Sequence, residues 1–149
     1  LTDPVPRPEP PRPHRGASTV ILLDLGMGPI EKVNLAEGFA RFSEHWSPKI
    51  AGELNDFQVK LVKLQGEFVW HQHEKEDELF LVVKGRLRMQ LRSRTLELAP
   101  GEFVIVPHGV EHCPAAAEEC WVLLLEPKTT LNTGNLVNER TVHELERLS

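Results

Sequence analysis

The chain has 149 residues, of which 40% are hydrophobic, and its formal net charge is −5. This length and composition are sufficient for one domain with a hydrophobic core, and the acidic balance argues against nucleic acid as a partner. No apolar run approaches the roughly 18 residues that a membrane-spanning helix needs, so we expect no membrane association.

The first 16 residues contain six prolines. Proline fixes the backbone angle φ and lacks a hydrogen-bond donor, so residues 1–16 are expected to form an extended or flexible arm. The arm is either a solvated tail or a docking peptide. Residues 17–149 are expected to form a single domain, which begins with a strand at STVILLDL (18–25).

Two short helices are expected outside the main body. Asn34 is a suitable N-cap, Glu37 follows three residues later, and apolar residues then recur at helical spacing, which predicts a helix over about 35–44. Near the end of the chain, Thr141 and Glu144 have the spacing of a capping box. The spacing predicts a terminal helix there.

From about residue 53 onward the pattern is typical of strands. Short segments rich in Val, Leu, Ile and Phe alternate with turns that contain glycine or proline. In RLRMQLR (86–92), Leu87, Met89 and Leu91 share one face and the polar residues share the other, as in a strand with one buried side. The segments are DFQVKLVKLQ, FVWHQH, ELFLVVKGRLRMQLR, RTLELA, EFVIVP and CWVLLLE. This succession predicts an all-β sandwich or barrel.

The segment HQHEKEDE (71–78) contains a possible metal site. Side chains alternate along a strand, so His71 and His73 point to the same face, roughly 6–7 Å apart. If residues 78–83 pair antiparallel with residues 68–73, Glu78 returns to the two histidines. His112 follows the tight turn in PHGVEH, and a barrel could bring it to the same point.

Three imidazoles and one carboxylate suit Mn(II), Fe(II), Ni(II), Cu(II), Co(II) or Zn(II), and suit calcium or magnesium poorly. With one such ion the site would carry a formal charge of about +1, which favours an anionic or enolate-forming ligand.

Two longer patterns around these residues resemble the motifs of the cupin superfamily. Residues 66–85 resemble the first motif, Gly-x5-His-x-His-x(3,4)-Glu-x6-Gly, with one residue fewer before His71. Residues 101–112 resemble the second, Gly-x5-Pro-x-Gly-x2-His-x3-Asn, with Ala116 at the final position. The resemblance is to small single-domain cupins, of the cupin 2 or phosphomannose-isomerase-like kind.

This resemblance implies a single jelly-roll β-barrel. It also implies a divalent metal ion with the ligands His71, His73, Glu78 and His112. Cupins are often dimers, so a homodimer is expected.

Several further residues lead to expectations. Phe80, Val82 and Met89 are expected to line the pocket beside the metal. Phe68 and Trp70 have the opposite parity to the histidines, so we expect them to face away from the metal and either to pack against the N-terminal elements or to form a dimer interface.

The lysines and cysteines leave alternatives open. Lys60 and Lys63 point to opposite faces of their strand, so one of them could face the pocket. Cys113 and Cys120 bracket PAAAEE and could lie opposite each other in a hairpin. Two cysteines are too few for a disulfide scaffold, so free thiols and a cytoplasmic location are expected.

Three functions are compatible with these features, because one fold serves many activities. The first is an oxidoreductase of the dioxygenase type, acting on a small molecule, with Glu78 as a possible base. The second is an isomerase or lyase acting on a sugar or small carboxylate, in which the metal is a Lewis acid. The third is a non-catalytic module that binds a small metabolite. The chain has no tyrosine, which excludes a mechanism that needs a Tyr acid or radical.

Overall fold

The computed structural model describes residues 29–148. The proline-rich arm at 1–16 and the expected strand at 18–25 lie outside this range. The chain divides into two units, Leu1–Glu31 and Lys32–Ser149. Of the first unit only residues 29–31 are described, and they form no helix or strand. Among the described residues, no helix has the length and apolar character that crossing a membrane requires.

The second unit is almost entirely β-structure. Its elements in chain order are α1 (Leu35–Phe39), β1 (Lys49–Leu54), β2 (Phe57–Glu67), β3 (Glu78–Lys84), β4 (Leu87–Leu91), β5 (Thr95–Leu98), β6 (Phe103–Val106) and β7 (His112–Pro127). The all-β prediction is confirmed.

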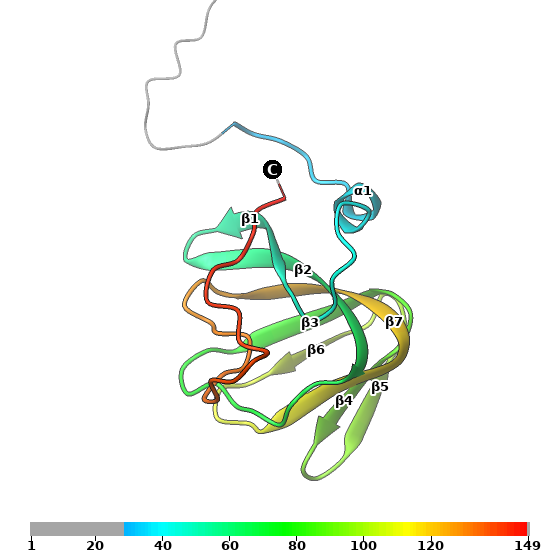
Figure 1. Ribbon diagram of the computed structural model, residues 1–149, viewed down its shortest axis with the longest axis vertical. Coiled ribbons are helices and arrows are strands. Elements are labelled where there is room, and N and C mark those ends of the chain that lie inside the picture. The colour runs from blue at the N-terminus through cyan, green and yellow to red at the C-terminus, as the bar shows by residue number, and fades with distance from the viewer. Residues whose placement is uncertain (1–28, 149) are drawn as a thin grey trace, which may run out of the picture. The chain divides into compact units, whose positions relative to one another are not determined.

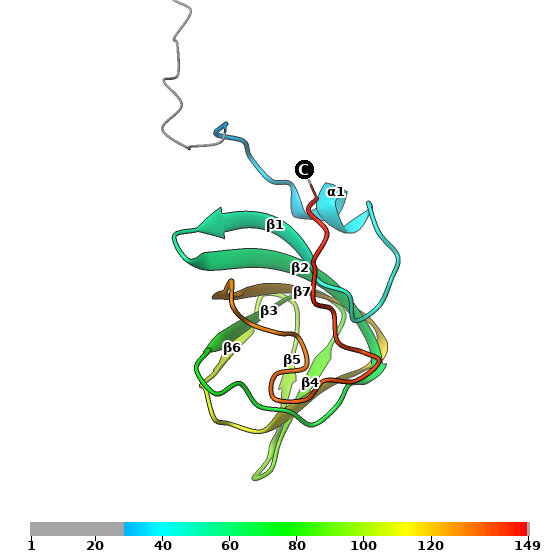
Figure 2. The ribbon, with the colours of Figure 1, turned by 60° about the vertical axis from the view of Figure 1, so that its left-hand side comes forward.

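All seven strands belong to one antiparallel sheet, and β7 is its central strand. The main path of the sheet runs β1-β2-β7-β3-β6, while β4 pairs with both β5 and β7. The beginning of β7 pairs with β4 and its end pairs with β3, while β2 pairs with β7 along most of its length, from Ala115 to Pro127. In Figures 1 and 2, β7 bends between its pairing with β4 and its pairing with β3, so that the sheet closes around an interior, as in a jelly-roll barrel.

The interior is filled by the alternate side chains of the strands, as expected for a sheet with one buried face. Leu87 and Met89 of β4 are fully buried, which confirms the alternation expected from RLRMQLR. They pack in one apolar cluster with Leu64, Val82 and Cys120. This cluster is the main hydrophobic core.

A second, smaller cluster covers the outside of β2. Phe39 of α1 stacks on Trp121 at 4.8 Å between ring centroids and packs against the buried Leu61. The Asn34 side chain accepts a hydrogen bond from the Glu37 N–H, as the capping pattern predicts. The helix ends at Phe39 rather than near residue 44, and the chain then joins the sheet through a bridge between His45 and Lys63.

Two expectations from the sequence are wrong. The terminal helix does not form, because the backbone of this segment bonds to the edge strand: Ile50 N–H donates to Glu146 O at 2.8 Å, and Leu148 N–H donates to Ile50 O at 2.9 Å. Cys113 and Cys120 do not face each other in a hairpin. Both lie in the single long strand β7, where they are buried, free thiols.

Candidate metal centre

The structure brings His71, His73, Glu78 and His112 together at one end of the barrel interior. Each offers one nitrogen or oxygen atom, and these four atoms lie within 4.8 Å of one another. All four side chains are buried, with at most 4% of any residue exposed. Such a group of ligand atoms could hold a metal ion.

The residues converge by a different route from the one expected. Residues 68–73 do not form a strand that pairs with β3; instead His71 forms an isolated bridge with His112 at the start of β7. Their backbones exchange hydrogen bonds of 3.1 and 2.9 Å. Glu78 arrives separately, as the first residue of β3, which pairs with β6 and β7. The reason is that β2 ends at Glu67 after a register shift near Gly66.

Two of the histidine rings are oriented by the backbone. His71 Nδ1 lies 2.9 Å from Val69 O, and His112 Nδ1 lies 2.9 Å from Val110 O. A carbonyl oxygen only accepts hydrogen bonds, so each Nδ1 carries the proton, and a neutral ring then has its lone pair at Nε2. This arrangement is typical of metal-binding histidines.

The third histidine has a ring nitrogen that a cation would engage. His73 Nε2 is buried and has no hydrogen-bond partner among residues 29–148, although it lies only 3.0 Å from Glu78 Oε2. His112 Nε2 lies 3.1 Å from the same oxygen. Buried polar atoms are nearly always satisfied, and one ion among these atoms would satisfy them together. The residues therefore fit a divalent metal.

The charge states also suit metal binding. Burial, assisted by the neighbouring His112, lowers the pKa of His71 to about 4, so His71 is neutral at physiological pH. Burial alone would raise the pKa of Glu78, but its hydrogen-bonding neighbours Glu126, His112 and His73 hold that pKa well below its usual value. Metal ligands must be deprotonated, and these two groups already are.

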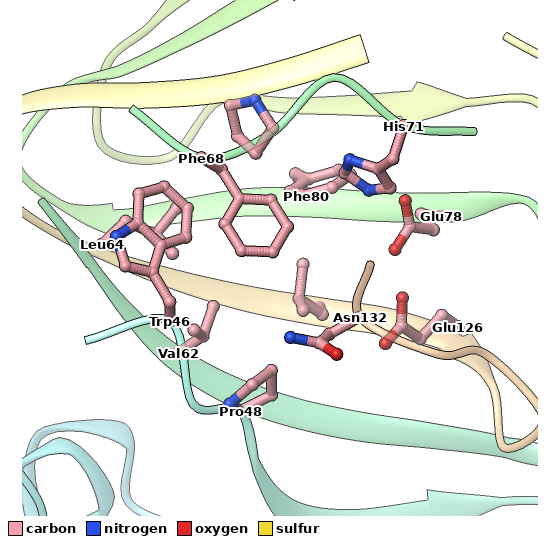
Figure 3. A pocket seen from close by; sticks show the side chains of 12 residues that line it. Trp46, Pro48, Val62, Leu64, Phe68, His71, Glu78, Phe80, Glu126 and Asn132 are labelled. Carbon is pink, nitrogen blue, oxygen red and sulfur yellow. The ribbon is translucent and has the colours of Figure 1, made fainter. Parts of the chain in front are cut away.

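An apolar cavity of about 40 Å³ adjoins the group (Figure 3). His71, Glu78 and Glu126 lie at one end of the view, and Trp46, Leu64 and Phe68 lie at the other. The full lining is Trp46, Pro48, Val62, Leu64, Phe68, His71, Glu78, Phe80, Pro114, Leu124, Glu126 and Asn132. The space suits a ligand of few atoms.

The structure places the expected pocket residues in one core cluster. Phe80, Val82 and Met89 all belong to it, but of the three only Phe80 lines the cavity. Phe68 does not face away: it is buried, lines the cavity and stacks on Trp46 at 4.7 Å between ring centroids. The direction of the Phe68 side chain could not be inferred by alternation from the histidines, because residues 68–70 are not in a strand.

Trp70 is only partly buried, and the Arg92 guanidinium lies over its ring at 3.8 Å from the centroid. An aromatic ring covered in this way by its own chain is a weaker candidate for a dimer interface.

A buried ion pair next to the cavity was not identified from the sequence. Lys60 Nζ lies 2.6 Å from Glu126 Oε1, and the two side chains are 1% and 2% exposed. Lys60 is thus the lysine that faces inward, while Lys63 faces outward and donates to Phe42 O. The alternation of side chains along CWVLLLE could have identified Glu126 as an inward-facing residue, because Glu126 lies on the same face of the strand as the buried Val122 and Leu124.

A C-terminal loop covers the outer side of the metal group. Asn135 N–H donates to Gln72 O at 2.9 Å, and the Asn135 side chain accepts from Gln72 N–H at 3.0 Å. Thr129 adds a hydrogen bond to Glu76. An open, polar cavity of about 390 Å³ lies between this loop and His73, so this side is a possible route of entry.

The other described histidines do not join the group. His108 is exposed and pairs with Asp77 at 2.8 Å, and His45 pairs with Glu119 at 2.8 Å. His143 is exposed. These residues can serve as controls for the four that converge.

Comparison with known proteins agrees with the fold. A family model described as a cupin domain matches residues 59–125. A crystal structure of a cupin-2 domain containing protein from Shewanella frigidimarina is 46% identical, with a TM-score of 0.64, over 64% of this chain and 94% of that one. A protein from Neisseria meningitidis is 31% identical, with a TM-score of 0.61, over 66% of this chain and 100% of that one.

A curated relative is similar over a shorter stretch. The uncharacterised protein YdbB of Bacillus subtilis (strain 168) is 36% identical over 61 residues, or 40% of this chain. The match spans 54% of the length of that relative.

Proposed function

The chain belongs to the cupin superfamily, and on that premise we propose that it is a metal-dependent enzyme acting on a small molecule, most simply as an oxidoreductase of the dioxygenase type. The observation that carries the proposal is the convergence of three buried imidazoles and one buried carboxylate beside an apolar cavity. This ligand set suits Mn, Fe, Ni, Cu, Co or Zn.

His71, His73, Glu78 and His112 would hold the ion. When bound, it would supply an electrophile and, for a redox-active metal, electrons for chemistry with O₂. The carbonyls of Val69 and Val110 fix the rings of His71 and His112. The burial of the four ligand side chains and the apolar lining of the cavity lower the local polarity, which strengthens electrostatic interactions within the site.

His71, His73, Glu78 and His112 would hold the ion beside the cavity, where it would be open to a small-molecule substrate. Because the site would carry a formal charge of about +1, an anionic or enolate-forming substrate is favoured.

An isomerase or lyase of sugars or small carboxylates is the second candidate. The observation that favours it is Glu126, a second buried carboxylate beside the metal group. Transfer of a proton between neighbouring carbon atoms needs such an acid–base group within reach of the substrate. In this reaction the metal would polarise a carbonyl group.

The first experiment is elemental analysis of the purified full chain beside a His71→Ala/His112→Ala variant. We expect near-stoichiometric metal in the parent protein and at least a tenfold loss in the variant. His108→Ala, at the exposed histidine paired with Asp77, is the matched control and should keep the metal. An absence of metal in the parent, even after reconstitution, would refute the proposal.

The second experiment separates the two reactions. Fe, Mn, Ni and Cu forms are tested for O₂ consumption with enolisable and catechol-like compounds, and the Zn form for exchange of substrate protons in D₂O. O₂ uptake supports the dioxygenase, and proton exchange without O₂ uptake supports the isomerase or lyase. Tight retention of a metabolite without turnover would instead indicate a binding module. A homodimer remains a prediction.

A further inference from the structure

We propose that the loop of residues 129–135, here called the strap, is a gate of the metal centre and opens to let a divalent ion pass through the polar cavity beside His73. The inference rests on the proposed metal-dependent function, because the ion is what the gate admits. The strap itself contributes none of the four converging ligands.

The four ligand side chains are buried too deeply for an ion to reach them while the chain stands still. His112 is fully buried, and His71, His73 and Glu78 are each 4% exposed. A bound transition-metal ion lies only about 2 Å from its nitrogen and oxygen ligands, so it has to come into direct contact with these atoms. One side of the group must therefore open.

The strap borders both cavities of the metal group. The polar cavity of about 390 Å³ lies between the strap and His73. Asn132 of the strap also lines the apolar cavity (Figure 3). The strap residues that line the polar cavity are Thr129, Leu131, Gly134 and Asn135. Movement of this one loop would thus open the group to solvent.

The attachment of the strap to the ligand segment consists of a few exposed hydrogen bonds. Asn135 N–H donates to Gln72 O at 2.9 Å, and Asn135 Oδ1 accepts from Gln72 N–H at 3.0 Å. Gln72 is the residue between the ligands His71 and His73. Thr129 Oγ1 donates to Glu76 Oε1 at 3.0 Å. Asn135 and Thr129 are exposed, so water can replace these bonds when the strap moves away.

The strap has an anchor of its own that does not depend on the ligand segment. Thr133 is fully buried, and its hydroxyl oxygen lies 2.7 Å from that of Thr141. Gly134 N–H donates to Leu131 O at 2.8 Å, which holds the turn together. Thr133 can therefore stay in place while the exposed Asn135 separates from Gln72.

The opposite side of the apolar cavity is harder to open. Trp46 and Phe68 stack there at 4.7 Å between ring centroids, and Phe68 is 8% exposed. Separating them would expose apolar surface to water, which is unfavourable in proportion to its area. Opening at the strap exposes mainly polar groups, so this side is the more favourable one.

The polar cavity also has the charge that attracts a cation. Glu74 and Glu76 line it together with a single lysine, Lys75. The cavity leads to His73, whose Nε2 is buried and has no hydrogen-bond partner among the described residues. A cation drawn in by the two carboxylates would meet this unpaired nitrogen beside the strap.

The test measures the rates at which Zn(II) enters and leaves the full chain. Stopped flow with a zinc-sensitive dye follows loading, and transfer of zinc to excess chelator follows release. Asn135→Ala removes the oxygen that accepts from Gln72 N–H, so the strap should open more often. We expect both rates to rise about threefold to tenfold, as the loss of one hydrogen bond predicts. Their ratio, the Kd, should change less than about twofold.

Asn138→Ala is the matched control for the gate. Asn138 is an exposed asparagine of the same C-terminal segment, but its side chain accepts from Arg140 N–H at 2.9 Å and does not bond to the ligand segment. This variant should leave both rates unchanged.

A second pair of variants tests the route. Glu74→Lys reverses a charge at the polar cavity and should slow loading at least about threefold at low salt, with a smaller effect in roughly 0.5 M NaCl. Glu118→Lys makes the same change at an exposed position of β7 that does not line this cavity. It should slow loading much less.

The outcomes separate the gate from the metal function. A parent protein that binds no zinc refutes both. If the parent binds zinc and Asn135→Ala leaves its rates unchanged, the gate is overturned and the metal function stands. A rise in the release rate alone also overturns the gate, because the strap would then only stabilise the bound ion. Equal loading of the Glu74→Lys and Glu118→Lys variants overturns the route through the polar cavity.

Discussion

The same strands carry opposite chemistry at the two ends of the barrel interior. Where β2 and β3 begin, their inward side chains include Lys60 and Glu78; where they end, the inward side chains are Leu64 and Val82. We call the first the polar end, made of Lys60, His71, His73, Glu78, His112 and Glu126, and the second the apolar end, made of Leu64, Val82, Leu87, Met89, Leu98 and Cys120.

The two ends differ in what each residue needs from its neighbours. A side chain at the apolar end needs only close packing, and each contributes stability through the area that it buries. At the polar end, every buried charge needs a partner, and removing one partner leaves the other exposed to its full desolvation cost. The apolar end therefore stabilises the barrel, while the polar end is suited to binding and chemistry.

Lys60→Met should give the largest loss of stability, because it leaves Glu126 buried without its cation. Breaking a buried ion pair in this way costs about 3 to 5 kcal/mol of unfolding free energy. Urea denaturation would measure the loss. The Lys60→Met/Glu126→Met variant should recover most of it, and a double variant as unstable as the single one would contradict the account of the polar end.

Leu87→Ala should cost about 2 to 5 kcal/mol, because it opens a cavity in the fully buried apolar end. Metal content should stay at the level of the parent protein, which would show that the two ends act independently. Leu54→Ala is the control, since Leu54 is 59% exposed and its loss should change the unfolding free energy by less than about 0.5 kcal/mol. Loss of metal in Leu87→Ala would contradict the separation.

Gly134→Ala should disturb the loop that covers the polar end. Gly134 has φ +58°, and an added Cβ would lie 2.2 Å from Gln72 O and 3.1 Å from His71 Cδ2. We expect a cost of about 1 to 3 kcal/mol and weaker metal affinity, measured by competition with a chelator. Gly101→Ala has φ +86° but nothing within 4 Å, so it should lose stability without losing affinity for the metal.

The smallest expected effect is the alkylation of the two cysteine thiols, which should hardly react in the folded protein. Burial raises the pKa of both Cys113 and Cys120 to about 11. At pH 8 only about one thiol in a thousand is then a thiolate, and the fraction rises roughly tenfold per pH unit up to the pKa. Iodoacetamide followed by mass spectrometry should modify the denatured protein fully and the native protein scarcely. Rapid native labelling at pH 8 would contradict this burial.

Much of the fold and of the candidate site could be predicted from local pattern. Alternation assigned the inward face of RLRMQLR, and the resemblance to the two cupin motifs identified the four residues that converge. The first feature depends on the two-residue period of a strand and the second on short motifs, both of which the chain carries locally.

The errors arose where the chain pairs with distant segments. A capping pattern at Thr141 predicted a helix, but hydrogen bonds to Ile50 hold that segment in an extended form. Parity counted from His71 placed Phe68 on the wrong side, because the strand ends before it. In both cases a tertiary contact outweighed a local preference.

By itself the sequence determined the all-β architecture, the superfamily and the residues that could bind a metal, because each depends on residue type and spacing within short segments. Only the tertiary structure decided that Lys60 and Glu126, 66 positions apart, meet beside Glu78. Such a meeting depends on the register between β2, β7 and β3, which pairs residues that are remote in the chain. The sequence of one segment alone does not show with which residue of another strand it will pair.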